Sequence, residues 1–286
     1  MAAWFEVTVD VPFDLSEVVA GYLLDLGSPG LEVVDGDGVT SLVAYFRDRA
    51  SIDSLRGLFA QLKPEARREW PPAIRSRLID EQDWAENWKR HFQPTPIGRH
   101  LQICPPWDTE GTVDRVNLII HPGMAFGTGQ HATTRSCLEL IEEVTSEGGL
   151  ARALDVGTGS GILSIALAKL GVTEVCALDI DPLACAIARE NSEANAVSSV
   201  VSVTDDWRAI NRPFDLIVAN LFTDLLREFA ERFEGLLAPN GRLVCSGFLT
   251  ADEPLVVAAY RRLTVMRRKE EEGWVALLLG AGGAVG

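Results

Sequence analysis

The sequence predicts an α/β protein in which a seven-stranded sheet is preceded by a small α+β domain. Three observations support this. The stretch from Ala153 to Asp181 has the pattern of a strand, a glycine-rich turn, a helix and a second strand, which is the crossover unit of parallel sheets. Further strand patterns follow it and alternate with helical ones. Residues 1–80 show their own alternation of strands and helices, so we expect two domains in a chain of 286 residues.

The first domain is expected over residues 1–80 and has the order β-α-β-β-α-β. Its strands are predicted at 4–11, 31–34, 39–46 and 74–79, and its helices at 14–26 and 52–62. A hairpin signal, Asp-Gly-Asp-Gly at 35–38, joins the second and third strands. The order is that of the ferredoxin-like motif. Because the domain carries no evident catalytic constellation, we expect its sheet to be a docking surface.

Residues 81–99 are predicted to form a linker. Trp84, Trp88 and Phe92 recur at helical spacing, and prolines at 94 and 96 end the pattern. This aromatic stripe is expected to hold the linker against a domain, and a direct role in substrate binding is the alternative. His91 is isolated in the same segment and is not expected to be catalytic.

The second domain is expected over residues 100–286 and begins with strands at 101–104 and 116–120. A loop from Pro122 to Thr134 follows, rich in glycine and small polar residues, and it leads into a helix at 135–144. Backbone amides and hydroxyls before a helix start can contact a ligand. One of Thr133 and Thr134 could equally be the N-cap of the helix.

The glycine-rich turn determines which class of ligand fits the second domain. Gly157, Gly159 and Gly161 do not have the Gly-x-Gly-x-x-Gly spacing of dinucleotide binders, in which a pyrophosphate meets the helix N-terminus. Asp155, just before them, would repel a phosphate and suits a positively charged ligand. Asp179 ends the next strand, where a carboxylate can accept both hydroxyls of a ribose. An adenosyl group with a cationic amino-acid tail therefore fits this turn.

The remaining elements complete the expected sheet. Asp181, followed by proline, is predicted to be the N-cap of the next helix. A buried strand pattern at 214–219 ends at Asn220, at the carboxyl end of a parallel strand, where ligands bind in open α/β sheets. The other predicted helices lie at 182–195, 225–237 and 254–260, and the other predicted strands lie at 200–203, 242–247, 263–268 and 274–279. The helix at 225–237 is expected to end before Pro-Asn-Gly at 239–241.

Composition excludes several classes of protein. The formal net charge is -15, and each of the segments 1–80, 81–150 and 151–286 has an excess of five acidic residues. A nucleic acid is therefore not expected as the direct substrate. The 5 cysteines include no Cys-x-x-Cys pair, so neither disulfides nor a metal site are expected. Because no signal peptide or membrane-spanning tract is evident, we expect a cytoplasmic protein without a membrane partner.

The acid-flanked glycine turn resembles that of class I methyltransferases, whose Rossmann-like domain binds S-adenosylmethionine. Four segments together resemble one family, the PrmA methyltransferases of protein eleven of the large ribosomal subunit. They are Glu-Gln-Asp-Trp-Ala-Glu-Asn-Trp-Lys at 81–89, Pro-Gly-Met-Ala-Phe-Gly-Thr-Gly-Gln-His-Ala-Thr-Thr at 122–134, Asp-Val-Gly-Thr-Gly-Ser-Gly-Ile-Leu at 155–163 and Val-Ala-Asn-Leu at 218–221. The resemblance covers residues 80–280 by motif, and residues 1–80 by topology alone.

The resemblance implies a function and a site. The first domain would capture the ribosomal protein, and the second would methylate lysine ε-amines and an N-terminal α-amine. Thr134, Gly157, Asp179 and Asn220 would contact the cofactor, with Asn220 also at the methyl-transfer centre. The glycine turn adds Asp155 and Gly159 to these contacts, and the loop adds Phe126.

This chain departs from the family pattern at several positions: Gln130 and Ala132 in the loop, Thr158 in the glycine turn, His121, and Leu-Phe-Thr at 221–223 in place of Ile-Leu-Ala. The ligating residue types are kept. A helix cap is the structural alternative for Asn220. The alternatives for function are a methyltransferase acting on another protein, a nicotinamide dehydrogenase, and a ribosome-binding module without enzymatic activity.

Overall fold

The computed structural model describes residues 3–12, 15–28, 31–35, 39–61, 72–80, 93–109, 114–121, 129 and 131–281. The chain forms two compact units, of which the first runs to Gln93 and the second begins at Pro94. Each unit has its own sheet and its own apolar core. Within the described ranges, no helix is long and apolar enough to cross a membrane.

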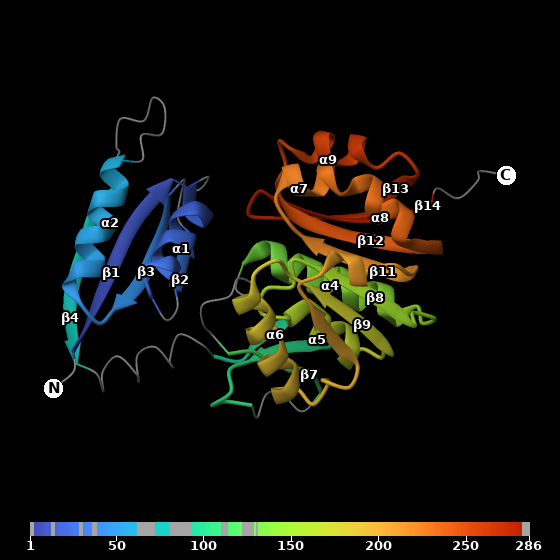
Figure 1. Ribbon diagram of the computed structural model, residues 1–286, viewed down its shortest axis with the longest axis horizontal. Coiled ribbons are helices and arrows are strands. Elements are labelled where there is room, and N and C mark those ends of the chain that lie inside the picture. The colour runs from blue at the N-terminus through green and yellow to red at the C-terminus, as the bar shows by residue number, and fades with distance from the viewer. Residues whose placement is uncertain are drawn as a thin grey trace. The chain divides into compact units, whose positions relative to one another are not determined.

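The first unit is a four-stranded antiparallel sheet with two helices on one face (Figure 1). Valines 7, 9 and 11 alternate along one strand and are fully buried beneath both helices, because successive strand residues point to opposite faces. The strand order is β2-β3-β1-β4, which confirms the predicted ferredoxin-like arrangement. Its elements are β1 (Ala3–Pro12), α1 (Ser16–Asp25), β2 (Leu31–Asp35), β3 (Val39–Phe46), α2 (Arg49–Gln61) and β4 (Ile74–Asp80).

The face of this sheet opposite the helices is charged. Arg75 lies 2.6 Å from Asp10, and Arg77 lies 2.6 Å from Glu6, in both cases across the β1–β4 pair. Both arginines are more than half exposed, so each pair contributes less than about 1 kcal/mol to stability.

The second unit is built on a seven-stranded sheet in the order β10-β9-β8-β11-β12-β14-β13, which confirms the predicted strand number. β14 runs in the direction opposite to all the other strands of this sheet, which are parallel to one another. The elements are α4 (Ala132–Ser146), β8 (Arg152–Val156), α5 (Ile162–Lys169), β9 (Glu174–Leu178), α6 (Pro182–Ala194), β10 (Val201–Thr204), the 3-10 turn η2 (Trp207–Ala209), β11 (Phe214–Asn220), α7 (Thr223–Glu228), α8 (Ala230–Leu236), β12 (Leu237–Leu249), α9 (Glu253–Ala259), β13 (Leu263–Glu271) and β14 (Trp274–Ala281).

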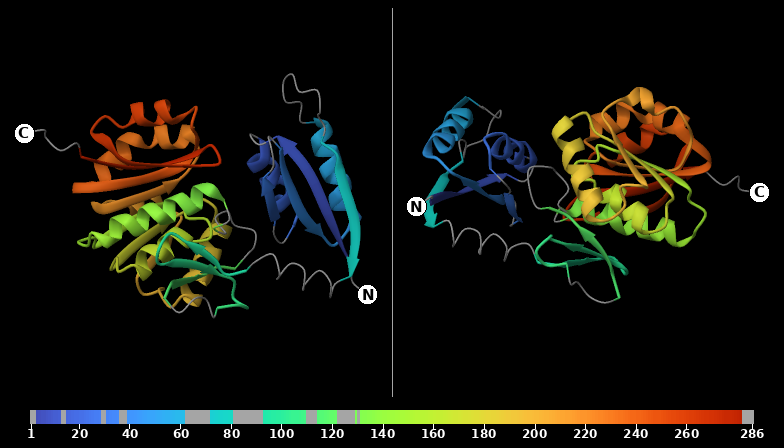
Figure 2. Two further views of the ribbon diagram at one scale, coloured as in Figure 1. Left: turned by 180° about the vertical axis from the view of Figure 1, so that it is seen from behind. Right: turned by 60° about the horizontal axis from the view of Figure 1, so that its bottom comes forward.

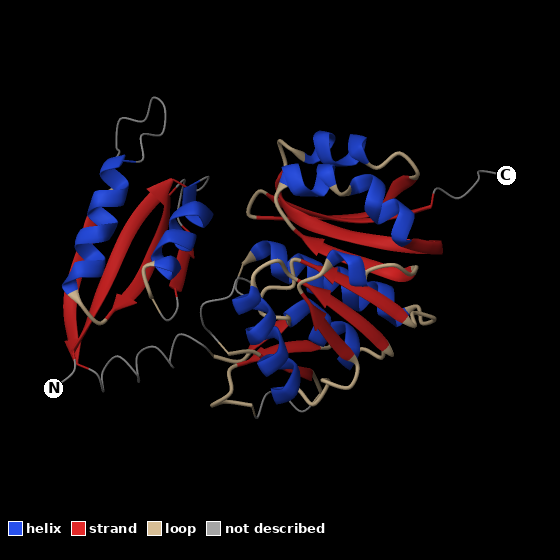
Figure 3. Ribbon diagram, viewed as in Figure 1, coloured by secondary structure: helices blue, strands red, loops and turns tan. Residues whose placement is uncertain are grey.

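Helices cover both faces of this sheet (Figure 3). Side chains of α4 and α5 build the apolar core on one face, and side chains of α7, α8 and α9 build the core on the other. A strand with both faces covered is apolar through its middle, as residues 216–219 of β11 show. The layered arrangement of the predicted α/β fold class is therefore confirmed.

A small three-stranded sheet adds to the core that α4 and α5 build (Figure 2). It consists of β5 (Thr95–Ile97), β6 (Leu101–Cys104) and β7 (Val116–Ile119), with β5 antiparallel and β7 parallel to β6. Ile97, Leu101 and Leu118 are buried in that core. Residues 94–99, which the sequence assigns to the linker, thus belong to the second unit.

Two predicted elements near the C-terminus differ from the structure. The single helix expected over 225–237 is divided into α7 and α8 at Phe229, whose ring packs 5.2 Å from the ring of Trp207. β12 starts at Leu237 and not at Arg242, because the Pro-Asn-Gly segment forms an irregularity inside the strand. At Gly241 a Cβ would lie 2.9 Å from the carbonyl oxygens of Phe214 and Ala238, so this irregularity requires glycine.

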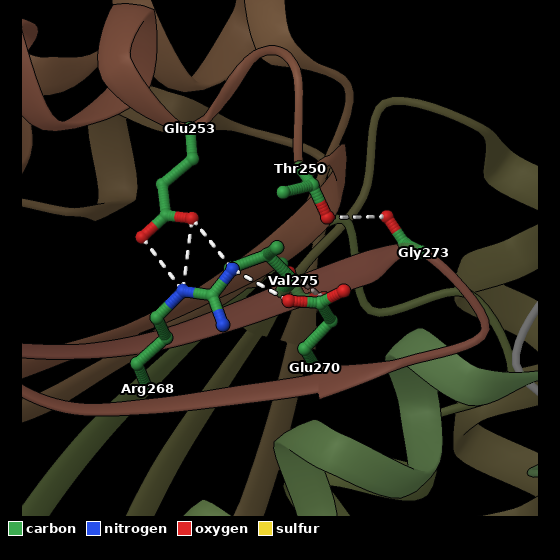
Figure 4. Close-up of polar contacts among 7 residues, drawn as sticks. Thr250, Glu253, Arg268, Glu270, Gly273 and Val275 are labelled. Atoms are coloured by element: carbon green, nitrogen blue, oxygen red, sulfur yellow. Dashed lines mark hydrogen bonds and ion pairs between the residues drawn. The ribbon is translucent and has the colours of Figure 1, made fainter.

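β13 is an edge strand of the large sheet, and an ion pair between Arg268 and Glu253 links it to α9 (Figure 4). The Nε atom of Arg268 donates to both carboxylate oxygens of Glu253 at 2.9 Å, and its Nη2 atom lies 2.8 Å from Glu270. At the turn before β14, the hydroxyl of Thr250 donates to the carbonyl oxygen of Gly273 at 3.1 Å. A charged edge of this kind opposes pairing with another strand.

Candidate active site

Three polar residues lie at the carboxyl ends of adjacent parallel strands. β8 lies between β9 and β11, and these strands carry Asp155, Asp179 and Asn220 at or next to their ends. Ligands of open α/β sheets bind at this edge. The structure therefore places these three predicted site residues along one edge of the sheet.

The glycine turn between β8 and α5 has no room for a side chain at Gly157 and Gly161. Gly157, Gly159 and Gly161 all have positive φ angles, of 73°, 53° and 82°. A Cβ on Gly157 would lie 2.5 Å from the Cδ2 atom of Leu221, and one on Gly161 would lie 3.2 Å from the Cα of Ala188. Glycine alone meets both requirements at these positions, a left-handed backbone and a close neighbour.

Asp155 is fully buried and supports the glycine turn with one of its oxygens. Its Oδ2 atom accepts from the hydroxyls of Thr158 and Ser164, both at 2.6 Å, and from the backbone N–H of Ser164 at 3.1 Å. Its Oδ1 atom is buried without a hydrogen-bond partner among the described residues. Burial raises the pKa of Asp155 to about 6, although the Ser164 and Thr158 hydrogen bonds oppose this rise.

Asp179 connects the end of β9 to the glycine turn. Its Oδ2 atom accepts from the backbone N–H of Gly159 at 2.9 Å, and its Oδ1 atom accepts from the N–H of Asp181 at 3.0 Å. Each oxygen of a carboxylate can accept more than one hydrogen bond, so Asp179 can also bind hydroxyls. Asp181 is the N-cap of α6 and accepts from the N–H of Leu183, as the sequence predicted.

The start of α4 lies at the end of β11. The Nδ2 group of Asn220 donates to the hydroxyl of Thr133 at 3.1 Å, and that hydroxyl lies 2.8 Å from Nδ1 of His131. His131 is the N-cap of α4, which begins at Ala132 and not at the predicted position 135, so neither threonine has that role. The Oγ1 atom of Thr134 is buried and has no partner among the described residues. Nor is Asn220 a helix cap, because the N-cap of α7 is Phe222.

Part of the predicted site lies outside the described residues. This applies to Phe126 and most of the loop before α4, and to the linker residues Trp84, Trp88, His91 and Phe92. The sequence analysis assigned no role to His131 or Leu221. Asp, Ser, Thr and Asn are the usual N-caps, and the contact of Leu221 with the glycine turn is a contact between distant segments, so neither had a local signal.

The described residues fit a cationic adenosyl ligand better than a dinucleotide. Three buried side-chain atoms of the described residues have no hydrogen-bond partner: Oδ1 of Asn117, Oγ1 of Thr134 and Oδ1 of Asp155. The last two belong to predicted cofactor contacts. A buried carboxylate favours an ammonium or sulfonium group and disfavours a pyrophosphate. Asp155, Asp179 and Thr134, with the side-chain-free glycine turn, would hold such a ligand.

A separate cavity of about 730 Å³ lies among α7, α8 and α9. Its lining includes Arg262 and Glu234, which pair with each other at 3.0 Å, together with Arg227, Glu231 and Leu255. It contains none of the predicted site residues. The strand ends, and not this cavity, carry the chemistry that a methyl donor requires.

Replacing Gly247 by alanine should disturb the site through Leu221. A Cβ on Gly247, whose φ is +96°, would lie 2.5 Å from the carbonyl oxygen of Leu221, next to Asn220. Gly171 has nearly the same φ, +98°, but open space around it, so Gly171→Ala is the matched control. We expect Gly247→Ala to lower the free energy of unfolding by about 2 kcal/mol more than the control does. Urea unfolding measures both, and equal losses would contradict the close contact.

Comparison with known proteins adds to this geometry. A family model described as "Ribosomal protein L11 methyltransferase (PrmA)" matches residues 3–281 of the chain. The ribosomal protein L11 methyltransferase of Pelotomaculum thermopropionicum is 35% identical over 307 aligned positions, covering 96% of this chain and 97% of the relative. The protein of the same name from Geobacter metallireducens is 37% identical and covers 98% of each chain.

A solved structure is also similar. The crystal structure of ribosomal protein L11 methylase from Lactobacillus delbrueckii subsp. bulgaricus has a TM-score of 0.61 and 28% sequence identity to this chain. The match covers 66% of this chain and 99% of that one. The sequence comparison and the structure comparison therefore both identify ribosomal protein L11 methyltransferases as similar to this chain.

Proposed function

This chain belongs to the ribosomal protein L11 methyltransferase (PrmA) family, and we propose that it transfers methyl groups from S-adenosylmethionine to amines of ribosomal protein L11. The observation that carries this proposal is the family match over residues 3–281, to which the polar strand ends of the second unit add a site of suitable chemistry. The acceptors that we propose are lysine ε-amines and the N-terminal α-amine. The protein would work in the cytoplasm, where ribosomes are assembled.

The two units are assigned different tasks in this proposal. We assign recognition of the ribosomal protein to residues 1–80 and methyl transfer to the second unit, from Pro94 onward. The proposed linker of residues 81–99 would then end at Gln93, since residues 95–97 form β5. The charged face of the first sheet, with its Arg75 and Arg77 pairs, supports a docking role for that unit.

The acceptor amine must be uncharged when it reacts. A lysine with a pKa of about 10.4 lies roughly 3.4 units above neutral pH, so removing its proton costs about 4.6 kcal/mol. A desolvated pocket lowers this cost, because burial favours the neutral form of an amine. S-adenosylmethionine, when bound, supplies a methyl group whose transfer leaves a neutral thioether.

We assign to Asn220 the task of orienting the acceptor. Its Nδ2 group is held by the hydroxyl of Thr133, and its Oδ1 atom accepts from no described residue. This oxygen can accept an N–H of the acceptor amine and so direct the nitrogen lone pair. We assign the backbone carbonyl of Leu221, the next residue in the chain, as a second acceptor. The contribution of both groups is positioning, and a strong general base is not required.

Mass spectrometry tests the proposed function directly. Purified protein L11 is incubated with the enzyme and isotopically labelled S-adenosylmethionine, and the modified residues are located by peptide mapping. We expect label on lysine side chains and on the N-terminus of L11. Label on a different ribosomal protein but not on L11 would overturn the substrate, and absence of label from all of them would overturn the activity.

Asp179→Ala should weaken binding of S-adenosylmethionine about tenfold. The carboxylate is placed to accept hydrogen bonds from the ribose hydroxyls, and a hydrogen bond to a charged group contributes about 1.5–3 kcal/mol. Asp181→Ala is the matched control, since this neighbouring carboxylate caps α6. It should lower stability by about 1 kcal/mol and leave affinity unchanged. Calorimetric titration with S-adenosylmethionine, and with NAD for comparison, measures both variants. Equal affinities of the two variants, or tighter binding of NAD, would contradict the assignment.

A further inference from the structure

A single hydroxyl connects Asn220 to the N-cap of α4. Oγ1 of Thr133 lies 2.8 Å from Nδ1 of His131 and 3.1 Å from Nδ2 of Asn220. Thr133 is 1% exposed, so water does not compete for these bonds. The two outer residues lie on different elements, the start of α4 and the end of β11.

A third hydrogen bond determines which atom donates and which accepts in these two contacts of Thr133. Nδ1 of His131 also accepts from the backbone N–H of Thr133, at 3.3 Å, and a ring nitrogen that accepts carries no proton. The hydroxyl of Thr133 must therefore give its own proton to Nδ1. Toward Asn220 it can then only accept, which requires the Nδ2 group on that side. The carbonyl oxygen of Asn220 is consequently turned away from Thr133, which makes it available to an amine.

The ring of His131 is itself held in place. It packs edge-on against the indole of Trp274, with 5.0 Å between the ring centroids and an angle of 70° between the planes. Trp274 begins β14, directly after the turn that Thr250 anchors through Gly273 (Figure 4). Arg135, one turn into α4, lies 2.8 Å from Glu271 in the same turn of the chain. The β13–β14 turn thus supports the ring that orients Thr133.

We propose that His131 is a positioning residue that sets the amide orientation of Asn220 through the hydroxyl of Thr133, and that protonation of its ring reverses that orientation. This inference rests on the proposed function of Asn220. A proton on Nδ1 makes the ring a donor to Thr133, whose hydroxyl proton then points to Asn220. The amide responds by turning Oδ1 toward Thr133, and its NH2 group then faces the acceptor amine, which it cannot orient.

The charged side chains near His131 form ion pairs with one another. Among the described residues they are Arg135 on α4 and Glu271 and Glu272 at the β13–β14 turn, and Arg135 pairs with both glutamates. Imidazole is the side chain that ordinarily exchanges a proton between about pH 5 and 8, a range in which methyl transfer is measurable. The protein is therefore expected to be sensitive to pH at Asn220 as well as at the acceptor amine.

Nuclear magnetic resonance of asparagine side chains tests the orientation without donor or substrate. With selectively ¹⁵N-labelled asparagine, Asn220→Asp identifies the NH2 signal of Asn220. We expect slow hydrogen exchange for this group in the native protein and in His131→Asn, because an asparagine N-cap offers an acceptor to the same N–H and hydroxyl. Exchange should become at least tenfold faster in His131→Ala and Thr133→Val. Thr145→Val, the same change at the other end of α4, should leave the signal unaltered.

Kinetics test the consequence for methyl transfer. At saturating donor, log(kcat/KM) for protein L11 should rise with pH with slope one, because the acceptor amine loses its proton. In the native enzyme the slope should be steeper in the acid range where the ring of His131 is protonated. His131→Asn should keep slope one throughout. Thr133→Val should lower kcat about 10- to 100-fold and change the KM for the donor less than threefold, while His100→Ala, an exposed histidine of the same unit, should match the native enzyme.

The two experiments separate the possible failures. Fast exchange of the Asn220 amide in the native protein, or identical exchange in Thr133→Val, would overturn the positioning role whatever the activity. Equal pH slopes in the native enzyme and His131→Asn would overturn the effect of protonation. Absence of methyl transfer by the native enzyme, with the exchange pattern as expected, would overturn the proposed function and leave the orientation established.

Discussion

Asn220→Ala is expected to lower the rate of methyl transfer to protein L11 about 100- to 1,000-fold, the size of effect typical for removal of a group that orients a reacting atom. The alanine removes both the acceptor Oδ1 and the Nδ2 donor to Thr133. Single-turnover rates with saturating donor measure the effect, because they exclude product release. Asn220→Asp should not restore the rate, since a carboxylate cannot donate to Thr133.

The loss in Asn220→Ala should not come from unfolding. Asn220 ends β11 and is partly exposed, so its side chain contributes little to the core. We expect the melting temperature to stay within a few degrees of the native value and the affinity for S-adenosylmethionine to fall by less than the rate does. A rate close to the native one would remove Asn220 from the transfer centre. A large fall in melting temperature would assign it a structural role instead.

Features that depend on local sequence were predicted well. The glycine turn, the N-cap at Asp181 and the placement of Asp179 and Asn220 at strand ends all follow from the spacing of residues close together in the chain. The positive φ angles of Gly157, Gly159 and Gly161 have the same origin, because the crossover from β8 to α5 needs a tight turn. The number of strands in the large sheet follows from the same alternation of strand and helix patterns, whereas the order of those strands was not predicted.

Features that depend on contacts between distant segments were missed. Thr133 and Asn220 are separated by 87 positions, so the bond between them has no trace in the spacing of either motif. The division of the helix at Phe229, whose ring packs against that of Trp207, was not predicted either. In each case tertiary structure decides what local propensity leaves open.

Asp155 shows where a local reading is incomplete. Its position before the glycines suggested a ligand contact alone, whereas one of its oxygens supports the turn through Thr158 and Ser164. The other oxygen is the buried one without a described partner. The residue therefore has two possible tasks, and a substitution that keeps the first while weakening the second can separate them.

Asp155→Asn should stabilise the ligand-free protein at neutral pH while weakening its affinity for S-adenosylmethionine about 100-fold. The pKa of Asp155 is raised from 3.8 to about 6 by burial, so the folded state disfavours the charged form. The stability that this group contributes is complete below its unfolded pKa and is lost as pH rises through its folded pKa. At pH 7 the loss amounts to about 3 kcal/mol, at about 1.36 kcal/mol per unit. The asparagine is neutral at every pH and should remove that loss.

Unfolding in urea between pH 4 and pH 8 measures this effect. The native protein should lose stability from this group as pH rises from 4 to 7, and Asp155→Asn should give a flatter profile. The control is Asp215→Asn, because the Asp215 carboxylate accepts the backbone N–H groups of Ala151 and Arg152 at 2.9 Å in the same unit. This variant should lose stability at neutral pH and keep its affinity for the donor.

Binding should change in the opposite direction, because a cationic ligand requires the charged form of Asp155. Below pH 6 the carboxylate must release its proton when S-adenosylmethionine binds. The Kd of the native protein should therefore fall about tenfold for each unit by which the pH rises toward 6, and it should stay constant above pH 6. In Asp155→Asn the Kd should be weak and nearly independent of pH. A variant that is less stable at every pH but binds the donor normally would show that Asp155 only supports the glycine turn. Gain of stability together with loss of affinity is expected only if the buried charge is kept for a cationic ligand.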